Sequence, residues 1–249
     1  MKLPAGLITA LQNSKKTLVL TGAGMSAESG VPTFRDAQSG LWARFRPEEL
    51  ATPQAFKSNP QTVWDWYAER RENIQKVCPH AGHLALVEME DYFETLLLVT
   101  QNVDGLHQQA GSRNVIELHG NIMQSICSET GKRFEDSWIK SNPGRPPASP
   151  HHPKGLARPA VVWFGEVLPA DAMSRATAAA LECDVCFSIG TSTLVQPAAS
   201  LPFIALNAGA VVIEINPTPT LLSAKAHFGL QATAAETLTR IMSALTHCN

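Results

Sequence analysis

The chain of 249 residues has few cysteines, no long apolar run and almost no net charge. Its five cysteines form an odd, widely spaced set, which is typical of reduced thiols and argues against a small domain held by disulfides. No apolar stretch reaches the length that spans a bilayer, and residues 1–16 predict a short amphipathic helix instead of a signal peptide. We therefore expect a cytoplasmic protein without membrane contact.

The charge is balanced as well as small, because 20 Lys and Arg residues and 22 Asp and Glu residues leave a formal net charge of −2. A nearly neutral protein lacks the basic surface through which nucleic-acid-binding proteins contact phosphates. The sequence also has no internal repeat. A chain of this length can bury one large core and carry a small appended module, so we expect no nucleic-acid partner and a single catalytic or binding unit.

Apolar, β-rich runs alternate along the chain with segments of helical periodicity. The strand-like runs are 17–21, 95–100, 115–118, 160–164, 184–189 and 210–215. The helix-like segments are 3–13, 80–91, 169–182, 197–208 and 233–245. This alternation predicts an α/β fold in which helices cover both faces of one parallel sheet.

Two segments interrupt the alternation. Residues 38–79 are rich in tryptophan and charge, and residues 121–157 end in a proline-rich stretch that disfavours both helix and strand. We predict that these two insertions fold together as a small module. The large domain would then consist of 1–37, 80–120 and 158–249.

The apolar run Thr17–Leu20 leads into Gly22-Ala23-Gly24, a turn at which bare backbone can approach a phosphate group. The pattern departs from the dinucleotide fingerprint G-x-G-x-x-G, because Ala27 occupies the place of the third glycine. No clear acidic residue follows at the offset that reads a ribose. The glycines alone favour nucleotide binding and a plain tight turn about equally.

Polar residues follow the strand-like run 95–100. Gln101, Asn102 and Asp104 place two amides and a carboxylate at the carboxyl end of a strand, where α/β proteins bind ligands. An Asx turn before Gly105 is the alternative interpretation, because Asn and Asp initiate turns through local hydrogen bonds.

A histidine follows the next strand-like run. His119 comes directly after 115–118 and before Gly120, which leaves room for a ligand. A histidine at a strand end is a candidate general base near neutral pH, and a structural role is the alternative.

Taken together, segments 22–35, 101–107 and 118–120 resemble the motifs of the sirtuins. Further matches are 158–166, 189–192 and 213–217, so the resemblance covers nearly the whole chain. It implies a Rossmann-like domain, a small module beside it and a cleft between the two. It also implies NAD-dependent lysine deacylation, in which nicotinamide leaves, the acyl group passes to ADP-ribose and free lysine is released.

The resemblance implies roles for individual residues, none of which needs a metal. His119 would be the general base, and Asn102 would position a water or the ribose. The residues that would bind NAD are Gly22, Ala23, Gly24 (through backbone N–H groups), Phe34, Arg35, Gln101, Asn102, Asp104, Gly190, Thr191, Ser192 and Asn216. The residues that would pair as a strand with the substrate peptide are Val162, Trp163, Phe164, Gly165 and Glu166. His107 lies within a matching motif, but we interpret it as a structural hydrogen-bonding residue.

The acyl preference is indicated by Tyr67 and Arg70, which share one face of a predicted helix. A guanidinium can bind a carboxylate through two hydrogen bonds, which suits the distal carboxylate of succinyl-, malonyl- or glutaryl-lysine. The alternative is an aromatic core residue followed by a solvated Arg70-Arg71 pair. Because the Tyr-x-x-Arg pair and the small Ala37 resemble the sirtuin branch that removes acidic acyl groups, we predict desuccinylase or demalonylase activity ahead of deacetylase activity.

One departure from the family concerns the zinc site that most sirtuins build from two Cys-x-x-Cys pairs. Here Thr130 stands at the position that would pair with Cys127, and the second cysteine pair is replaced by a stretch that contains His151 and His152. A four-thiolate site is excluded. A mixed site of Cys127, His151 and His152 would need an acidic side chain as its fourth ligand, so we expect no metal.

Apolar packing is the expected substitute for the metal, through Ile126, Phe134, Trp138 and Ile139. A second thiol spacing, Cys183-x-x-Cys186, runs into an apolar strand and is interpreted as structural.

Two other functions stay open at this point. An NAD glycohydrolase or ADP-ribosyltransferase would use the same pocket and pass the ribose to water or to a side chain. A non-catalytic NAD-binding domain is disfavoured, because no expected catalytic residue is missing. The motifs carry no information on self-association.

Overall fold

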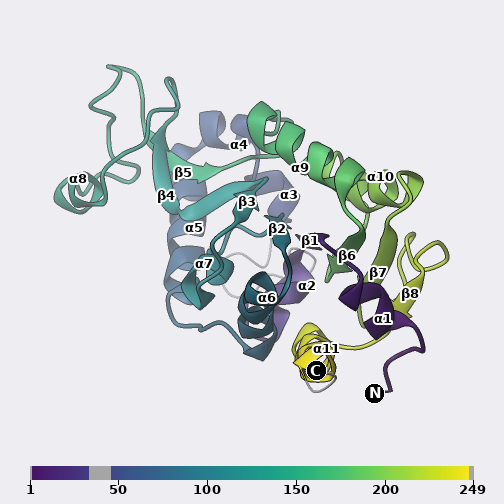
Figure 1. Ribbon diagram of the computed structural model, residues 1–249. Coiled ribbons are helices and arrows are strands. Elements are labelled where there is room, and N and C mark those ends of the chain that lie inside the picture. The colour runs from purple at the N-terminus through teal and green to yellow at the C-terminus, as the bar shows by residue number, and fades with distance from the viewer. Residues whose placement is uncertain (1, 34–45, 247–249) are drawn as a thin grey trace.

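The computed structural model describes residues 2–33 and 46–246, which form a six-stranded parallel sheet with helices on both faces (Figure 1). The strand order is β3-β2-β1-β6-β7-β8, and every neighbouring pair is parallel. The strands are β1 (Lys16–Thr21), β2 (Thr95–Thr100), β3 (Val115–Glu117), β6 (Val185–Ile189), β7 (Val211–Ile215) and β8 (Phe228–Leu230). The predicted α/β class is confirmed.

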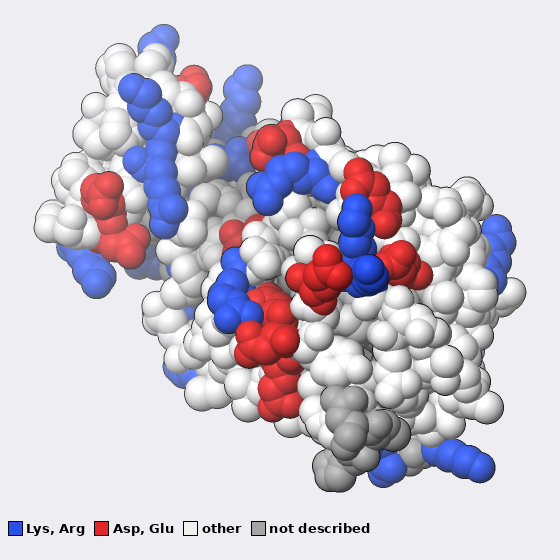
Figure 2. Space-filling model, viewed as in Figure 1, with Lys and Arg blue, Asp and Glu red and all other residues white. Residues whose placement is uncertain are grey.

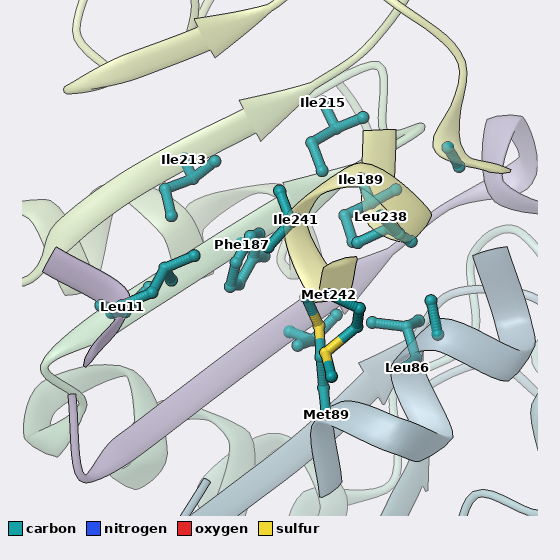
Figure 3. Packing of buried hydrophobic residues seen from close by; sticks show 14 of the residues in the cluster. Leu11, Leu86, Met89, Phe187, Ile189, Ile213, Ile215, Leu238, Ile241 and Met242 are labelled. Carbon is teal, nitrogen blue, oxygen red and sulfur yellow. The ribbon is translucent and has the colours of Figure 1, made fainter. Parts of the chain in front are cut away.

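Continuous apolar runs form the central strands because both of their faces are covered. Alternate residues of β1 enter opposite cores, with Val19 in one and Leu18 and Leu20 in the other. On the first face lie α1 (Leu7–Gln12), α6 (Ala81–Tyr92) and α11 (Ala234–Thr246) (Figure 3). On the second face lie α9 (Ala170–Glu182) and α10 (Leu201–Asn207), the latter preceded by the 3₁₀ turn η2 (Ala198–Ser200).

A second, two-stranded sheet lies beside the first and consists of β4 (Gly120–Cys127) and β5 (Ala157–Val161), which are antiparallel. The prediction of a strand at 160–164 within the parallel sheet is therefore wrong in both place and partner. The physical reason lies in Pro159, which has no N–H and so cannot complete the hydrogen bonds of a central strand. A two-stranded sheet has only edge strands and accepts it.

Helices from the first insertion pack on this small sheet. They are α3 (Pro47–Leu50), α4 (Pro53–Ser58) and α5 (Pro60–Ile74). The sequence starts α4 and α5 in the same way, with a proline in the first turn and a capping side chain before it: Thr52 accepts from the Ala55 amide and Asn59 from the Thr62 amide. The shared core joins both insertions, because Trp66 of α5 and Ile122 of β4 lie in one cluster.

The remaining helices are short. They are α2 (Ala23–Ala27), α7 (Leu106–Ala110) and α8 (Asp136–Ser141). The segment between β4 and β5, including α8, projects from one end of the molecule (Figure 1). Within the described residues, no helix has the length and apolarity needed to cross a bilayer.

Basic and acidic side chains are interspersed on the face shown in Figure 2. Exposed ion pairs among the described residues include Arg113 with Asp91 and Lys16 with Glu182. The balanced composition of the sequence is thus also a local balance on this face.

Candidate active site

The strand order reverses at β1, because the chain builds outward to β2 and β3 and then returns to β6 on the other side of β1. A crevice at the carboxyl ends of the strands is expected where an open α/β sheet reverses in this way. Thr21 and Ile189 are register partners at these ends, and Gly22 and Gly190 follow them. The predicted glycine turn therefore lies at the switch point of the sheet.

Two glycine turns contact each other at this point without room for side chains. A Cβ on Gly24 would lie 2.8 Å from the Gly190 Cα, and a Cβ on Gly190 would lie 2.4 Å from the Met25 nitrogen. Gly190 also has φ +60°, a conformation that glycine adopts without strain. These contacts bring the first turn of α2 against the end of β6.

The amides of this turn are partly used within the protein. The Gly22 N–H donates to the Ile189 carbonyl oxygen at 3.0 Å and the Gly24 N–H to the Gly190 carbonyl oxygen at 2.9 Å. Two of the three amides of Gly22-Ala23-Gly24 that are predicted to contact a pyrophosphate thus already have acceptors within the protein. Among the described residues, the Ala23 amide has no acceptor, so it is the donor that the turn offers to a phosphate.

A buried polar cluster lies behind the turn. The Asn102 side-chain amide donates to the Gly22 carbonyl oxygen at 3.0 Å and to the Ser26 hydroxyl at 3.1 Å. Asp104 is also buried and accepts from the Leu106 amide at 2.9 Å, as the Asx-turn interpretation predicted. Burial raises the pKa of Asp104, while the bonds from Leu106 and Ser26 oppose that shift. Ser26 belongs to this cluster although its sequence context gave it no role of its own.

His119 is held in one orientation at the end of β3. Its Nδ1 lies 2.9 Å from the Gln101 carbonyl oxygen, and a carbonyl can only accept, so Nδ1 carries the proton. In the neutral ring Nε2 then has an unshared pair. Burial lowers the pKa of His119, with the Gln101 bond opposing it, so the ring is neutral near pH 7 and suited to act as a base.

His107 has the structural role predicted for it. Its Nε2 lies 2.9 Å from the Thr21 hydroxyl, which itself donates to the Thr100 hydroxyl at 2.8 Å. Burial lowers its pKa to about 4, so the ring is neutral. These bonds tie the ends of β1 and β2 together below the site.

The other side of the crevice is formed after β6 and β7. The Asn216 side-chain amide donates to the Thr191 carbonyl oxygen at 2.7 Å, and the Thr191 hydroxyl bonds to Ser188. Buried Thr193 has φ +55°, which is rare for a β-branched residue and marks local strain of the kind that collects at functional sites. No pattern in the sequence indicated Thr193.

Tyr67 and Arg70 of α5 lie close to the peptide-binding residues that the resemblance implied. Tyr67 is buried, and its hydroxyl accepts from the Trp163 indole N–H at 3.0 Å. Burial raises the pKa of Tyr67 to about 12, so it stays protonated. The Arg70 guanidinium is half-buried and lies 5.0 Å from the Trp66 ring.

The neighbouring Arg71 has a different role. Its Nε donates to the Ile122 carbonyl oxygen at 2.6 Å, and its guanidinium stacks 4.8 Å from the Trp64 ring. The two consecutive arginines are therefore not a solvated pair, because Arg71 joins α5 to β4.

The segment Val162–Glu166 is not a strand but a turn that follows β5. Its first amides are already bonded, that of Val162 to the His119 carbonyl oxygen and that of Phe164 to the Ala51 carbonyl oxygen, both at 2.9 Å. The Glu166 carboxylate accepts from the Trp163 amide and forms a two-bond pair with Arg158. The expected strand thus ends at Val161, because Glu166 folds the chain back on itself.

Phe34, Arg35 and Ala37 lie outside the described residues, so their predicted roles stay predictions. The Cys183 and Cys186 thiols lie in the core beneath α9 and α10, which supports the structural interpretation of their spacing.

Comparison with known proteins identifies the family to which the chain belongs. The family model described as Sir2 family matches residues 22–197. An NAD-dependent protein deacylase of Caldanaerobacter subterraneus subsp. tengcongensis is 50% identical over 228 residues, which cover 91% of this chain and 92% of that protein.

Solved structures agree with this match. The crystal structure of a Sir2 homolog–NAD complex superimposes with a TM-score of 0.91 at 43% identity, covering 99% of this chain and 95% of that one. A Sir2 protein bound to an acetylated peptide has a TM-score of 0.85 at 28% identity, covering 95% and 96%. The glycine turns, the oriented His119 and these matches together show that the chain belongs to the Sir2 family.

Proposed function

We propose that this Sir2-family enzyme is an NAD-dependent protein-lysine deacylase that removes acidic acyl groups, namely succinyl, malonyl and glutaryl, and also acetyl. The observation that carries the proposal is a series of direct contacts. The His119 backbone bonds to Val162, and the adjacent Trp163 bonds to Tyr67, which lies one helical turn before Arg70. The general base, the peptide-binding segment and the acyl-selecting pair are thus parts of one connected structure.

The glycine turn suits NAD, because the Ala23 amide is an available donor for its phosphates at the N-terminus of α2. Bound NAD supplies the bond between ribose and nicotinamide, whose cleavage creates the acceptor for the acyl group. Buried Asn102 and Asp104 present fixed polar groups to that end of the crevice and exclude water from it. His119 Nε2 then accepts a proton from a ribose hydroxyl.

The substrate is an acyl-lysine peptide, and a related Sir2 structure contains an acetylated peptide. The bonded amides of Val162 and Phe164 leave Gly165 as the best pairing position on this side. A Cβ built on Gly165 would meet nothing within 4 Å, so open space lies beside this turn, in which Gly165 has φ +88°. The exposed side chains of Phe164 and Val167 flank this position.

Preference for acidic acyl groups is supported by the difference between the two arginines of α5. Arg71 donates to the Ile122 carbonyl oxygen, whereas Arg70 lies over the Trp66 ring on the helix face of Tyr67, whose hydroxyl is held by Trp163. A half-buried guanidinium beside a protonated phenol is suited to bind a carboxylate.

The experiment that tests the proposal follows both products of one reaction. The purified protein is incubated with NAD and with matched succinyl-, malonyl- and acetyl-lysine peptides, and peptide mass and O-acyl-ADP-ribose are measured together. We expect faster loss of the acidic acyl groups and one O-acyl-ADP-ribose per deacylated lysine. Free ADP-ribose without deacylation would instead identify an NAD glycohydrolase, and ADP-ribose attached to protein would identify a transferase.

A further inference from the structure

Two turns face each other where β4 ends and β5 begins. The first contains Cys127-x-x-Thr130 and is closed by the Gly131 N–H, which donates to the Cys127 carbonyl oxygen at 2.9 Å. The second contains Ser149-x-x-His152 and is closed by the Gly155 N–H, which donates to the His152 carbonyl oxygen at 3.0 Å. Each turn thus has the two-residue spacing with which paired ligands hold a tetrahedral metal.

The two turns converge on one point. A Cβ built on Gly155 would lie 2.6 Å from the Cys127 sulfur, 3.0 Å from the Ser149 Cβ and 3.3 Å from the His152 Cβ. Cys127 is 1% exposed. The side chains of both turns therefore enclose a small volume that has no room for another group on Gly155.

The sulfur at this point is surrounded by donors. Burial raises the pKa of the Cys127 thiol, but hydrogen bonds from the Ser149 and Thr130 hydroxyls and from the Glu129 and Thr130 amides lower it by more. Donors aimed at a sulfur from adjacent turns are also what surrounds a metal-bound thiolate. Thr130 and Ser149 stand at the sequence positions where the two-residue spacing would place further ligands, and their hydroxyls accept the Lys132 and His151 amides.

These residues do not fit a structural zinc ion. Hydroxyls are poor zinc ligands, and they leave only Cys127 and His152 as suitable donors. His151 points elsewhere, because its Nε2 contacts the Arg133 carbonyl oxygen at 3.2 Å and its ring lies 5.3 Å from the Phe134 ring. Within the residues that the structure describes, no group of three or more His, Cys, Asp and Glu side chains could hold a metal ion.

We propose that Cys127, Thr130, Ser149 and His152 form a metal-free clamp that keeps the residue spacing of a four-ligand zinc site and holds the end of β4 to the start of β5 around a buried thiol. Apolar packing supports the clamp through a cluster of Trp64, Cys127, Phe134 and Ala157, with Trp138 and Ile139 against it. Three of the four residues predicted to replace the metal lie in this cluster, and Ile126 does not.

The clamp has a consequence for the active site. β5 runs from the clamp at Ala157 to Val161, and the next residue bonds to the His119 backbone. Cys127 pairs with Ala157 at one end of the small sheet and Gly120 pairs with Val161 at the other, with a register shift between Asn121 and Ser125. The clamp therefore holds in place the strand that leads into the peptide-binding segment.

Restoring thiols tests the geometry directly. The full-length triple variant Thr130→Cys, Ser149→Cys and His152→Cys is reduced, reconstituted with zinc, dialysed and analysed for bound metal, with cobalt as a spectroscopic probe. We expect about one zinc per chain, the thiolate-to-cobalt absorption of a tetrahedral four-sulfur site and a higher Tm, whereas the wild type retains less than about 0.1 zinc.

The matched control has the same four thiols with one of them out of place. The variant Thr130→Cys, Ser149→Cys and His151→Cys should bind zinc at least tenfold more weakly, because the Cys at 151 does not face Cys127. Equal zinc affinity of the two triple variants would overturn the proposed geometry. A fall in wild-type Tm on treatment with a strong chelator would overturn the metal-free clamp.

A second variant tests the clamp even where a triple variant does not fold. Cys127→Val keeps about the same side-chain volume but removes the thiol that the Ser149 and Thr130 hydroxyls approach. We expect its Tm to fall by about 3 to 8 °C, and Cys127→Ser to lose less. A Cys127→Val protein as stable as the wild type would show that the thiol only fills space.

Discussion

At the scale of single residues, the site depends on which atoms of a side chain are already bonded. The His119 Nδ1–H donates a hydrogen bond to a backbone carbonyl oxygen, which leaves Nε2 available. His107 instead uses its Nε2 in a hydrogen bond with Thr21. The two histidines are near each other in the sequence motifs. His107 also has a ring nitrogen without a hydrogen bond, Nδ1, but that atom is fully buried and so is not available to a ligand.

The first prediction concerns the base. Replacing His119 with Ala should lower kcat for deacylation by about 10²- to 10⁴-fold, because a positioned general base is lost. NAD affinity should change by less than about threefold, since the glycine turns and Asn102 are untouched. Steady-state kinetics and calorimetric titration with NAD give the two values. Turnover near the wild-type rate would remove His119 from the reaction.

The second prediction concerns acyl selectivity. Arg70→Met should lower kcat/KM for succinyl-lysine peptide by about 10- to 100-fold, because a charge-assisted pair with the distal carboxylate is lost. The value for acetyl-lysine peptide should change by less than about threefold. Arg71→Met is the matched control, and it should lower Tm without changing the succinyl-to-acetyl ratio, since Arg71 bonds to Ile122. Equal losses on both peptides for Arg70→Met would mean that Arg70 only packs.

At the scale of elements, the crevice depends on the contact between two turns. The turn between β1 and α2 and the turn after β6 approach so closely that glycine is required on both sides. The first turn contributes its carbonyl oxygen to Asn102, and the second is held by Asn216. The segment after β5 is likewise held from both ends, by His119 and by the Arg158–Glu166 pair.

The third prediction separates steric overlap from backbone conformation. Gly190→Ala should lower the free energy of unfolding by about 3 kcal/mol or more, because its Cβ would lie 2.4 Å from the Met25 nitrogen at φ +60°. Gly209→Ala is the matched control: its φ is +95°, and its Cβ would meet nothing within 4 Å. The positive φ alone should then lower the free energy of unfolding of the Gly209→Ala variant by about 1 kcal/mol. Urea denaturation measures both, and similar losses would contradict the close approach of the two turns.

At the scale of the whole molecule, three histidine rings connect the start of α6, which covers one face of the sheet, to the candidate active site. His80 and His83 at the start of α6 have ring centroids 4.3 Å apart, and the His83 and His107 centroids are 5.0 Å apart. The His80 Nε2 contacts the Met25 carbonyl oxygen at 2.6 Å, so the three rings connect α6, α7 and α2. Burial lowers the pKa of His83 to about 3 and that of His107 to about 4.

The fourth prediction follows from these values. A histidine whose pKa is lower in the folded state stabilises the fold above its unfolded pKa of about 6.5, and the stabilisation is lost as the pH falls toward the folded pKa. His107 alone should account for a loss of about 3 kcal/mol between pH 7.5 and pH 4. His107→Asn should therefore make the free energy of unfolding less dependent on pH over this range.

The control for this experiment is His151→Asn, which changes an exposed histidine outside the cluster. Urea denaturation at pH 7.5, 5.5 and 4.5 compares the two variants with the wild type. A His107→Asn protein with the same pH dependence as the wild type would show that acid unfolding has another origin.

The sequence by itself determined the fold class and the glycine turns, and it predicted which residue is the base. Alternating apolar runs predict a parallel sheet because a strand buried on both faces needs apolar side chains on both, and five of the six predicted strands lie in that sheet. His119 and Asn102 could be assigned because their motifs combine a strand end with a functional group.

Only the tertiary structure decided which groups remain available. The pairing of β5 with β4, the internal bonds of the Gly22 and Gly24 amides, the turn at Glu166 and the different contacts of Arg70 and Arg71 all depend on partners far away in the chain. The same holds for the turns that converge on Cys127. A motif specifies local conformation and chemistry, but whether a donor, a carboxylate or a thiol is free to meet a ligand depends on neighbours that folding brings together.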